Sequence, residues 1–212
     1  VHQWIAFQAW RMLPDEDLKD ELGSYLPTEA NDERYISETP SQWHDPPLYN
    51  QPYRQGDALI EGTCEEDTPF YRVDNHFWDP SSHYNDGILL FNSAPMHAED
   101  HYQMALDSYP IDKTVAYYWL GRTVHLLEDM SLPPHTLLDP HVSAFGVGDP
   151  SPMEKYMASE DPVTGDSIYR NYQTGIWPSS TLSDYPGQEG SPYREMIKIF
   201  YSMADYSERF DS

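Results

Sequence analysis

Cysteine and basic residues are scarce in this chain. Its 212 residues include a single cysteine, Cys64, so no disulfide bond can form within the chain. Twelve lysines and arginines stand against 36 aspartates and glutamates, which gives a formal net charge of −24 at pH 7. Such a surface repels a polyanion such as duplex DNA unless a metal ion or a local basic patch intervenes. The simplest meaning of the charge is solubility.

Long hydrophobic runs are also missing. No apolar stretch approaches the length of a membrane-spanning helix, and no signal peptide is visible. The sequence begins at Val1, without an initiator methionine and inside a segment with a helical pattern, so we expect upstream residues that were removed by processing or are left out of this sequence. What is present, 39% hydrophobic and 14% aromatic residues, is enough to bury a core.

Apolar residues recur with a helical period in several segments, and proline-rich and glycine-rich stretches separate them. We predict helices over residues 1–13, 56–66, 96–108, 111–130, 149–159 and 193–210. The strongest is 111–130, where Asp112 can cap the amino end and Pro133 and Pro134 follow the carboxyl end.

No alternating strand pattern is found, so the prediction is an all-α fold: a single multi-helix domain over residues 1–212. Two long irregular excursions, 23–54 and 161–190, interrupt it. Long loops of this kind are uncommon in a compact domain unless they are functional or held in place. We expect a buried metal cluster to hold them.

The clearest candidate for a metal site lies on the strongest predicted helix. His125 and Asp129 are four residues apart, so both project from one face, and Gly121 leaves room beside them. The helix breaks at the two prolines, which lets His135 come back toward the first two ligands, and His141 follows. Zinc favours this mixture of imidazole and carboxylate ligands.

Other residues have plainer interpretations. His97 and His101 form a second pair four residues apart that can bind a metal, but an ordinary surface or core role is favoured for them. Glu128 points away from Asp129 and is expected to act as an ion-pair partner or to support a metal ligand. Cys64 is expected to be a small buried residue.

Four segments resemble, in the same order, motifs of the bacterial zinc-dependent phospholipases C and the related single-strand-specific zinc nucleases. They are Tyr118–His135 (YWLGRTVHLLEDMSLPPH), Asn75–Pro80 (NHFWDP), Gly62–Asp67 (GTCEED) and His2–Ala9 (HQWIAFQA). The first is specific and the second fairly specific, whereas the other two are weak on their own.

The resemblance implies an arrangement of two or three zinc ions. It places Asp67, His76, His125 and Asp129 on the first ion, with Asp129 bridging to a second ion that is also held by His2 and the mature amino terminus. It places His135, His141 and Glu154 on the third ion. Pro150 occupies the position where the family usually has its later histidine, which leaves His141 as the candidate and Asp149 as the fallback.

The function that the resemblance implies is zinc-dependent hydrolysis of a phosphodiester. The favoured form is phospholipase C-type cleavage at the glycerol–phosphate bond, with Asp67 also orienting the attacking water and loop aromatics such as Tyr25 contacting lipid or only anchoring the loops. A single-strand-specific nuclease and a non-catalytic, metal-stabilised interaction domain are the alternatives. We also expect a secreted or extracytoplasmic location, transient contact with a membrane surface and no obligate protein partner.

Overall fold

The computed structural model describes residues 2–26, 58–66, 75–81, 84–85, 87, 92–137 and 193–208. Every regular element in these segments is a helix and none is a strand, which confirms the predicted all-α fold. The helices are α1 (His2–Arg11), α2 (Glu16–Gly23), α4 (Ala58–Glu65), α5 (Ala94–Ser108), α6 (Lys113–Asp129), α7 (Pro133–Thr136) and α9 (Arg194–Glu208). No helix in the described part of the chain is long and apolar enough to cross a membrane. The predicted helix 149–159 and nearly all of both excursions lie outside the described residues.

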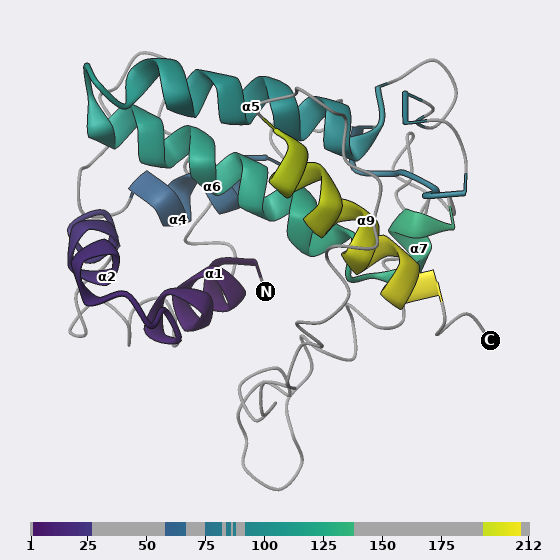
Figure 1. Ribbon diagram of the computed structural model, residues 1–212, viewed down its shortest axis with the longest axis horizontal. Coiled ribbons are helices and arrows are strands. Elements are labelled where there is room, and N and C mark those ends of the chain that lie inside the picture. Colours follow the sequence, from purple (N-terminus) through teal and green to yellow (C-terminus); the bar gives the residue numbers. More distant parts are fainter. Residues whose placement is uncertain are drawn as a thin grey trace, which may run out of the picture.

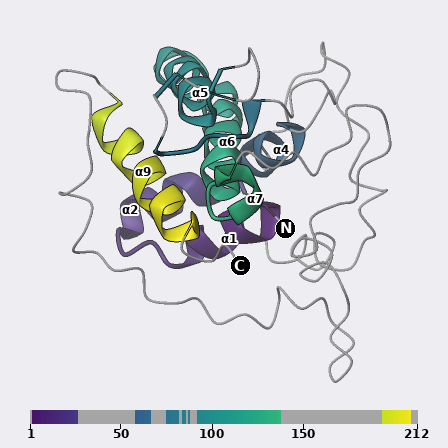
Figure 2. The ribbon, with the colours of Figure 1, turned by 90° about the vertical axis from the view of Figure 1, so that its right-hand side faces the viewer.

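Helix α6 is the centre of the fold. It runs antiparallel to α5, while α4 and α9 lie against other sides of it (Figures 1 and 2). Its amino end is capped as predicted, because the side chain of Asp112 accepts hydrogen bonds from the backbone N–H groups of Thr114 at 2.9 Å and Val115 at 3.3 Å. At the other end, Pro133 both follows α6 and opens α7, since proline suits the first turn of a helix.

Helices α4 and α6 cross with their backbones in contact. A Cβ atom added at Gly62 would lie 2.0 Å from the carbonyl oxygen of Tyr118, and one added at Gly121 would lie 2.1 Å from that of Leu59. No larger residue fits at either position without moving the helices apart. The space that Gly121 leaves free is therefore filled by the α4 backbone.

Two apolar clusters pack on either side of α6. The first joins α1, α4 and α6 and includes Ala6, Ile60 and Tyr118. The second joins α5, α6 and α9 and includes Trp78, Leu126, Met130, Phe200 and Ala204.

The aromatic ring of Tyr25 belongs to the first cluster. It packs 4.4 Å from the ring of Tyr117 and is 8% exposed, so this ring anchors the chain and does not face a ligand.

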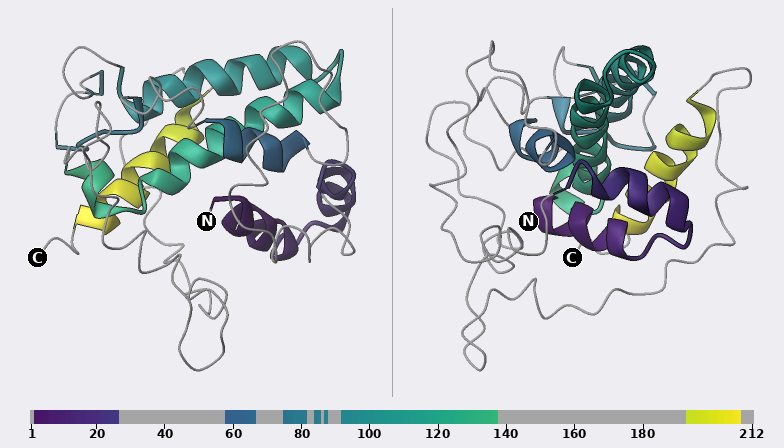
Figure 3. Two further views of the ribbon diagram at one scale, coloured as in Figure 1. Left: turned by 180° about the vertical axis from the view of Figure 1, so that it is seen from behind. Right: turned by 90° about the vertical axis from the view of Figure 1, so that its left-hand side faces the viewer.

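Helix α2 was not predicted from the sequence. It begins after Asp15, whose side chain accepts a hydrogen bond from the Leu18 backbone N–H at 3.0 Å, and acidic residues occupy its first turn. The indole of Trp10 on α1 donates to the Lys19 carbonyl at 2.8 Å and so ties the two helices together below α4 and α6 (Figure 3).

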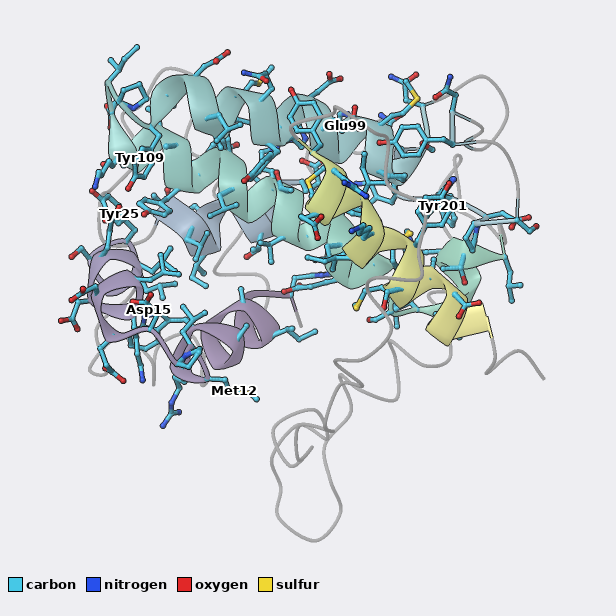
Figure 4. The ribbon with its side chains drawn as sticks, in the orientation of Figure 1. Met12, Asp15, Tyr25, Glu99, Tyr109 and Tyr201 are labelled. Carbon is cyan, nitrogen blue, oxygen red and sulfur yellow. The ribbon has the colours of Figure 1, made fainter. Side chains whose placement is uncertain are left out.

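A charged contact links α2 to the turn between α5 and α6. Glu21 accepts hydrogen bonds from the Tyr109 hydroxyl at 2.6 Å, the Lys113 amine at 2.8 Å and the Tyr117 hydroxyl at 2.6 Å. The bond from Lys113, followed by those from the tyrosines, lowers the pKa of Glu21 to about 2. Tyr109 and Tyr25 mark this end of the molecule, which is far from the carboxyl end of α6 (Figure 4).

Candidate metal centre

Four histidines surround the buried carboxylate of Asp129 at the carboxyl end of α6. From Oδ2, the nearest ring nitrogens are those of His76 at 2.7 Å, His125 at 3.3 Å and His135 at 3.9 Å. His2 approaches the other oxygen, with its Nε2 at 3.5 Å from Oδ1. We call these five residues the Asp129 centre. The structure thus brings together five of the eight residues that the sequence nominated.

Different elements supply these side chains. His125 lies one turn before Asp129 on α6, as the spacing required. His2 begins α1, and its ring stacks on that of His125 with 3.9 Å between centroids. His76 lies in the NHFWDP segment and His135 in α7, so the break after α6 does return a ligand toward the helix.

Backbone carbonyls orient two of the rings. Nδ1 of His125 lies 2.6 Å from the Thr63 carbonyl oxygen, and Nδ1 of His135 lies 2.9 Å from that of His76. A carbonyl can only accept, so Nδ1 is the donor and each neutral ring keeps its lone pair on Nε2. Metal-binding histidines are commonly fixed in this way.

A glutamate orients a third ring. Oε2 of Glu128 lies 2.8 Å from Nδ1 of His2, which leaves Nε2 of His2 facing Asp129. Glu128 is thus the hydrogen-bond partner of His2, and its support of a metal ligand stays a prediction. Phe77 stacks on His135 with 4.8 Å between centroids, so it forms an apolar wall of the centre, whereas Trp78 belongs to the core.

The protonation states in the centre suit metal binding. Burial raises the pKa of Asp129, but the charges of His135, His125 and His76 outweigh it and hold that pKa well below its usual value. Burial, with the neighbouring His125, lowers the pKa of His2 well below its ordinary value. Metal ions bind ionised carboxylates and neutral imidazoles, which are the forms these shifts favour for Asp129 and His2. Burial also raises the pKa of Glu128 well above its usual value.

The ligand atoms of the centre converge. One ligand atom from each of His2, His125 and Asp129 lies within 4.8 Å of the others, and Oδ2 of Asp129 has no hydrogen-bond partner among the described residues. A buried carboxylate oxygen without such a partner is costly unless a cation balances it. The residues present therefore fit a metal ion.

Three nominated residues, Asp67, His141 and Glu154, lie outside the described residues, as does the fallback Asp149. Their roles stay predictions.

A second cluster of possible ligands contains Glu66, His97 and His101, again with one ligand atom from each within 4.8 Å of the others. We call these three residues the Glu66 centre. The spacing of the two histidines was visible in the sequence, but their metal-binding role was the less favoured interpretation. Glu66 was missed, because no local pattern distinguishes it from the neighbouring acidic residues.

Comparison with known proteins adds no family to this description. No protein-family model matches the chain, and no curated protein matches it. The resemblance to the zinc-dependent phospholipases C and single-strand-specific nucleases therefore rests on the four short motifs.

Proposed function

We propose that this chain is a zinc-dependent phosphodiesterase and that the Asp129 centre holds its metal ions. The observation that supports the proposal best is a buried carboxylate surrounded by four histidines. Imidazole nitrogens and a carboxylate are the ligand set that zinc prefers when thiolates are absent.

The two oxygens of Asp129 support a bridging role. His2 makes its contact with Oδ1, whereas His76 and His125 make theirs with Oδ2. A carboxylate with different histidines at each oxygen can serve two ions at once. Zinc ions held there would supply a water of lowered pKa and positive charge for the phosphate oxygens.

The chain's own residues would keep this site in shape. Glu128 fixes the His2 ring, the Thr63 carbonyl fixes the His125 ring, and Phe77 covers one face of His135. Asp67, which the motif nominates as the carboxylate that orients the attacking water, is part of the same proposal.

A phospholipid is the favoured substrate. The formal charge of −24 disfavours a polyanionic strand, and a nuclease for single strands needs a basic track beside its stacking aromatics. A zwitterionic lipid such as phosphatidylcholine has no net charge to repel. The proposal is therefore phospholipase C-type hydrolysis at the glycerol–phosphate bond, outside the cytoplasm and with transient contact at a membrane surface.

The test begins with the metal. Protein purified without chelator is expected to contain zinc by elemental mass spectrometry and to release phosphocholine from phosphatidylcholine vesicles. If the protein instead releases nucleotides from single-stranded DNA, its function is that of a single-strand-specific nuclease. Zinc without either activity would favour a metal-stabilised interaction domain. Absence of bound metal after zinc is supplied would overturn the proposal.

The substitution Asp129→Asn tests the centre itself. We expect it to lower bound zinc and phosphodiesterase activity together, with activity falling at least about 100-fold, because one residue serves both ions. Asp112→Asn is the matched control, since it makes the same change on the same helix at a cap position that asparagine also fills well. Full metal content in Asp129→Asn would rule out the bridging role.

A further inference from the structure

The Glu66 centre lies where the end of α4 meets one face of α5. His97 and His101 are one turn apart on α5, and both rings face Glu66, the residue that follows α4. Nε2 of His97 lies 3.0 Å from Oε1 of Glu66, and Nε2 of His101 lies 3.0 Å from Oε2. Glu66 is fully buried, His101 is buried and His97 is half-buried.

The nitrogen and oxygen atoms in this cluster lie at ion-pair distance. Among the described residues, neither Nε2 atom nor Oε1 of Glu66 has a hydrogen-bond partner. Atoms bound to one ion at about 2.0–2.2 Å, at angles between octahedral and tetrahedral, lie about 3.0–3.5 Å apart. Each Nε2 atom thus lies at such a separation from one carboxylate oxygen of Glu66, and one ligand atom from each of the three residues lies within 4.8 Å of the others.

We propose that Glu66, His97 and His101 form a second metal site, separate from the Asp129 centre, for a divalent ion of the zinc class. Two imidazoles and one carboxylate oxygen would hold the ion, and water would complete its coordination on the side of the half-buried His97. The occupied site would join the end of α4 to α5. Neither the sequence motifs nor the proposed phosphodiesterase activity requires this ion.

Arg122 on α6 helps to keep Glu66 ionised and also occupies one of its two carboxylate oxygens. The guanidinium Nε donates to Oε2 of Glu66 at 2.5 Å, and Nη1 donates to the Tyr118 hydroxyl at 3.0 Å. Arg122 therefore holds one carboxylate oxygen, which leaves Oε1 as the ligand atom. Because its positive charge already balances Glu66, the Glu66 centre should bind a dication more weakly than the Asp129 centre.

The electrostatics agree with the geometry. Burial raises the pKa of Glu66, but the close approach of His101 and His97 and the charge of Arg122 outweigh it and hold that pKa well below its ordinary value. Burial lowers the pKa of His101. The site thus presents an ionised carboxylate and a neutral imidazole.

A single ring separates the two centres. Nδ1 of His76 lies 2.7 Å from Oδ2 of Asp129, and Nε2 of the same ring lies 3.9 Å from Oε1 of Glu66. The experiment must therefore assign each ion to its own ligands and not merely count zinc.

Metal-free protein dialysed against zinc provides the first test. His97→Ala should bind one ion fewer than the unmodified chain, while Asp100→Asn, which changes an exposed acidic side chain on the same helix, should bind the same number as the unmodified chain. His97 is half-buried and alanine favours helix, so α5 should persist. Equal zinc content in all three proteins would overturn the proposal.

A second test needs no substitution. In protein carrying nitrogen-15 in its histidines, zinc should shift the imidazole resonances of His97 and His101 after those of His125 have shifted. If both rings keep their metal-free resonances when zinc is in large excess, the Glu66 centre is not a metal site. This result is independent of any phosphodiesterase activity, so the two proposals can fail separately.

Discussion

The Asp129 centre and the Glu66 centre use the same types of ligand but are assembled in different ways. In the Asp129 centre, His125 and Asp129 lie one turn apart on α6, and among the described residues only histidines lie at ion-pair distance from the carboxylate. In the Glu66 centre, the carboxylate follows α4, the histidines lie on α5, and an arginine from α6 already neutralises the charge. We therefore expect the two proposed metal sites to differ in affinity, because the charge already present at each of them differs.

Both centres depend on the crossing of α4 and α6. The Thr63 carbonyl that orients His125 and the Glu66 carboxylate that meets Arg122 both come from the end of α4. Gly62 and Gly121 set how closely this segment approaches α6. The centres therefore share one support, and the following substitutions separate what is common to them from what is particular to each.

Gly121→Ala should have the largest effect, because it pushes α4, which contributes to both centres, away from α6. The new Cβ would lie 2.1 Å from the Leu59 carbonyl oxygen, so the helices must separate. We expect a loss of at least about 2 kcal/mol in the free energy of unfolding, although alanine favours a helix over glycine by about 1 kcal/mol. Denaturant unfolding measures this loss, and zinc binding should weaken at both centres.

Gly23→Ala is the matched control for that substitution. Its Cβ would meet the Trp10 ring at 3.2 Å, which is a side chain that can shift, so we expect little change. Equal stability of the two alanine variants would contradict the close crossing of α4 and α6.

Glu128→Gln should affect only the Asp129 centre. Glu128 orients the His2 ring across 2.8 Å, and loss of such a supporting carboxylate weakens metal binding by about 10- to 100-fold. Competition with a chromophoric chelator measures the change in zinc affinity. The histidine resonances of the Glu66 centre should respond to zinc as before, and a parallel loss at both centres would show that they are not independent.

Glu21→Gln should have the smallest effect and leave both centres intact. The substitution removes the charge that accepts from Lys113, Tyr109 and Tyr117 at the opposite end of α6. We expect a loss of about 1 kcal/mol in unfolding free energy at neutral pH, because the contact is partly exposed. Zinc content should not change.

The stability difference between the parent chain and Glu21→Gln should also depend on pH. The pKa of Glu21 is lowered from 4.5 to about 2 in the folded protein, so its contribution to stability is present above pH 4.5. That contribution is lost as the pH falls toward 2. The stability difference between the parent chain and Glu21→Gln should therefore shrink over this range, and a constant difference would contradict the ionic contact.

The local part of this structure could be predicted from the sequence. The Asp112 cap, the helical period and the spacing of His125 and Asp129 are short-range features of α6, and the structure has them as expected. Helix α2 could have been predicted too, because Asp15 followed by Glu16 and Asp17 is a typical helix start.

The long-range part could not be predicted in the same way. Glu66 meets His97 and His101 only because α4 and α5 both pack against α6, and no periodic pattern in the chain encodes that meeting. The approach of His2 to Asp129 depends likewise on the docking of α1. The sequence motif nominated His2 by resemblance, whereas nothing local nominated Glu66.

The close crossing of α4 and α6 also bears on how the protein opens. A helix of eight residues is too short to be stable alone in water, so α4 depends on its neighbours for its order. The α4 backbone lies directly against the α6 backbone, with no side chain between them that could move first. The two helices must therefore separate together. Amide hydrogen exchange should therefore report α4 and the middle of α6 as one cooperative unit, with the short helix protected as strongly as the long one.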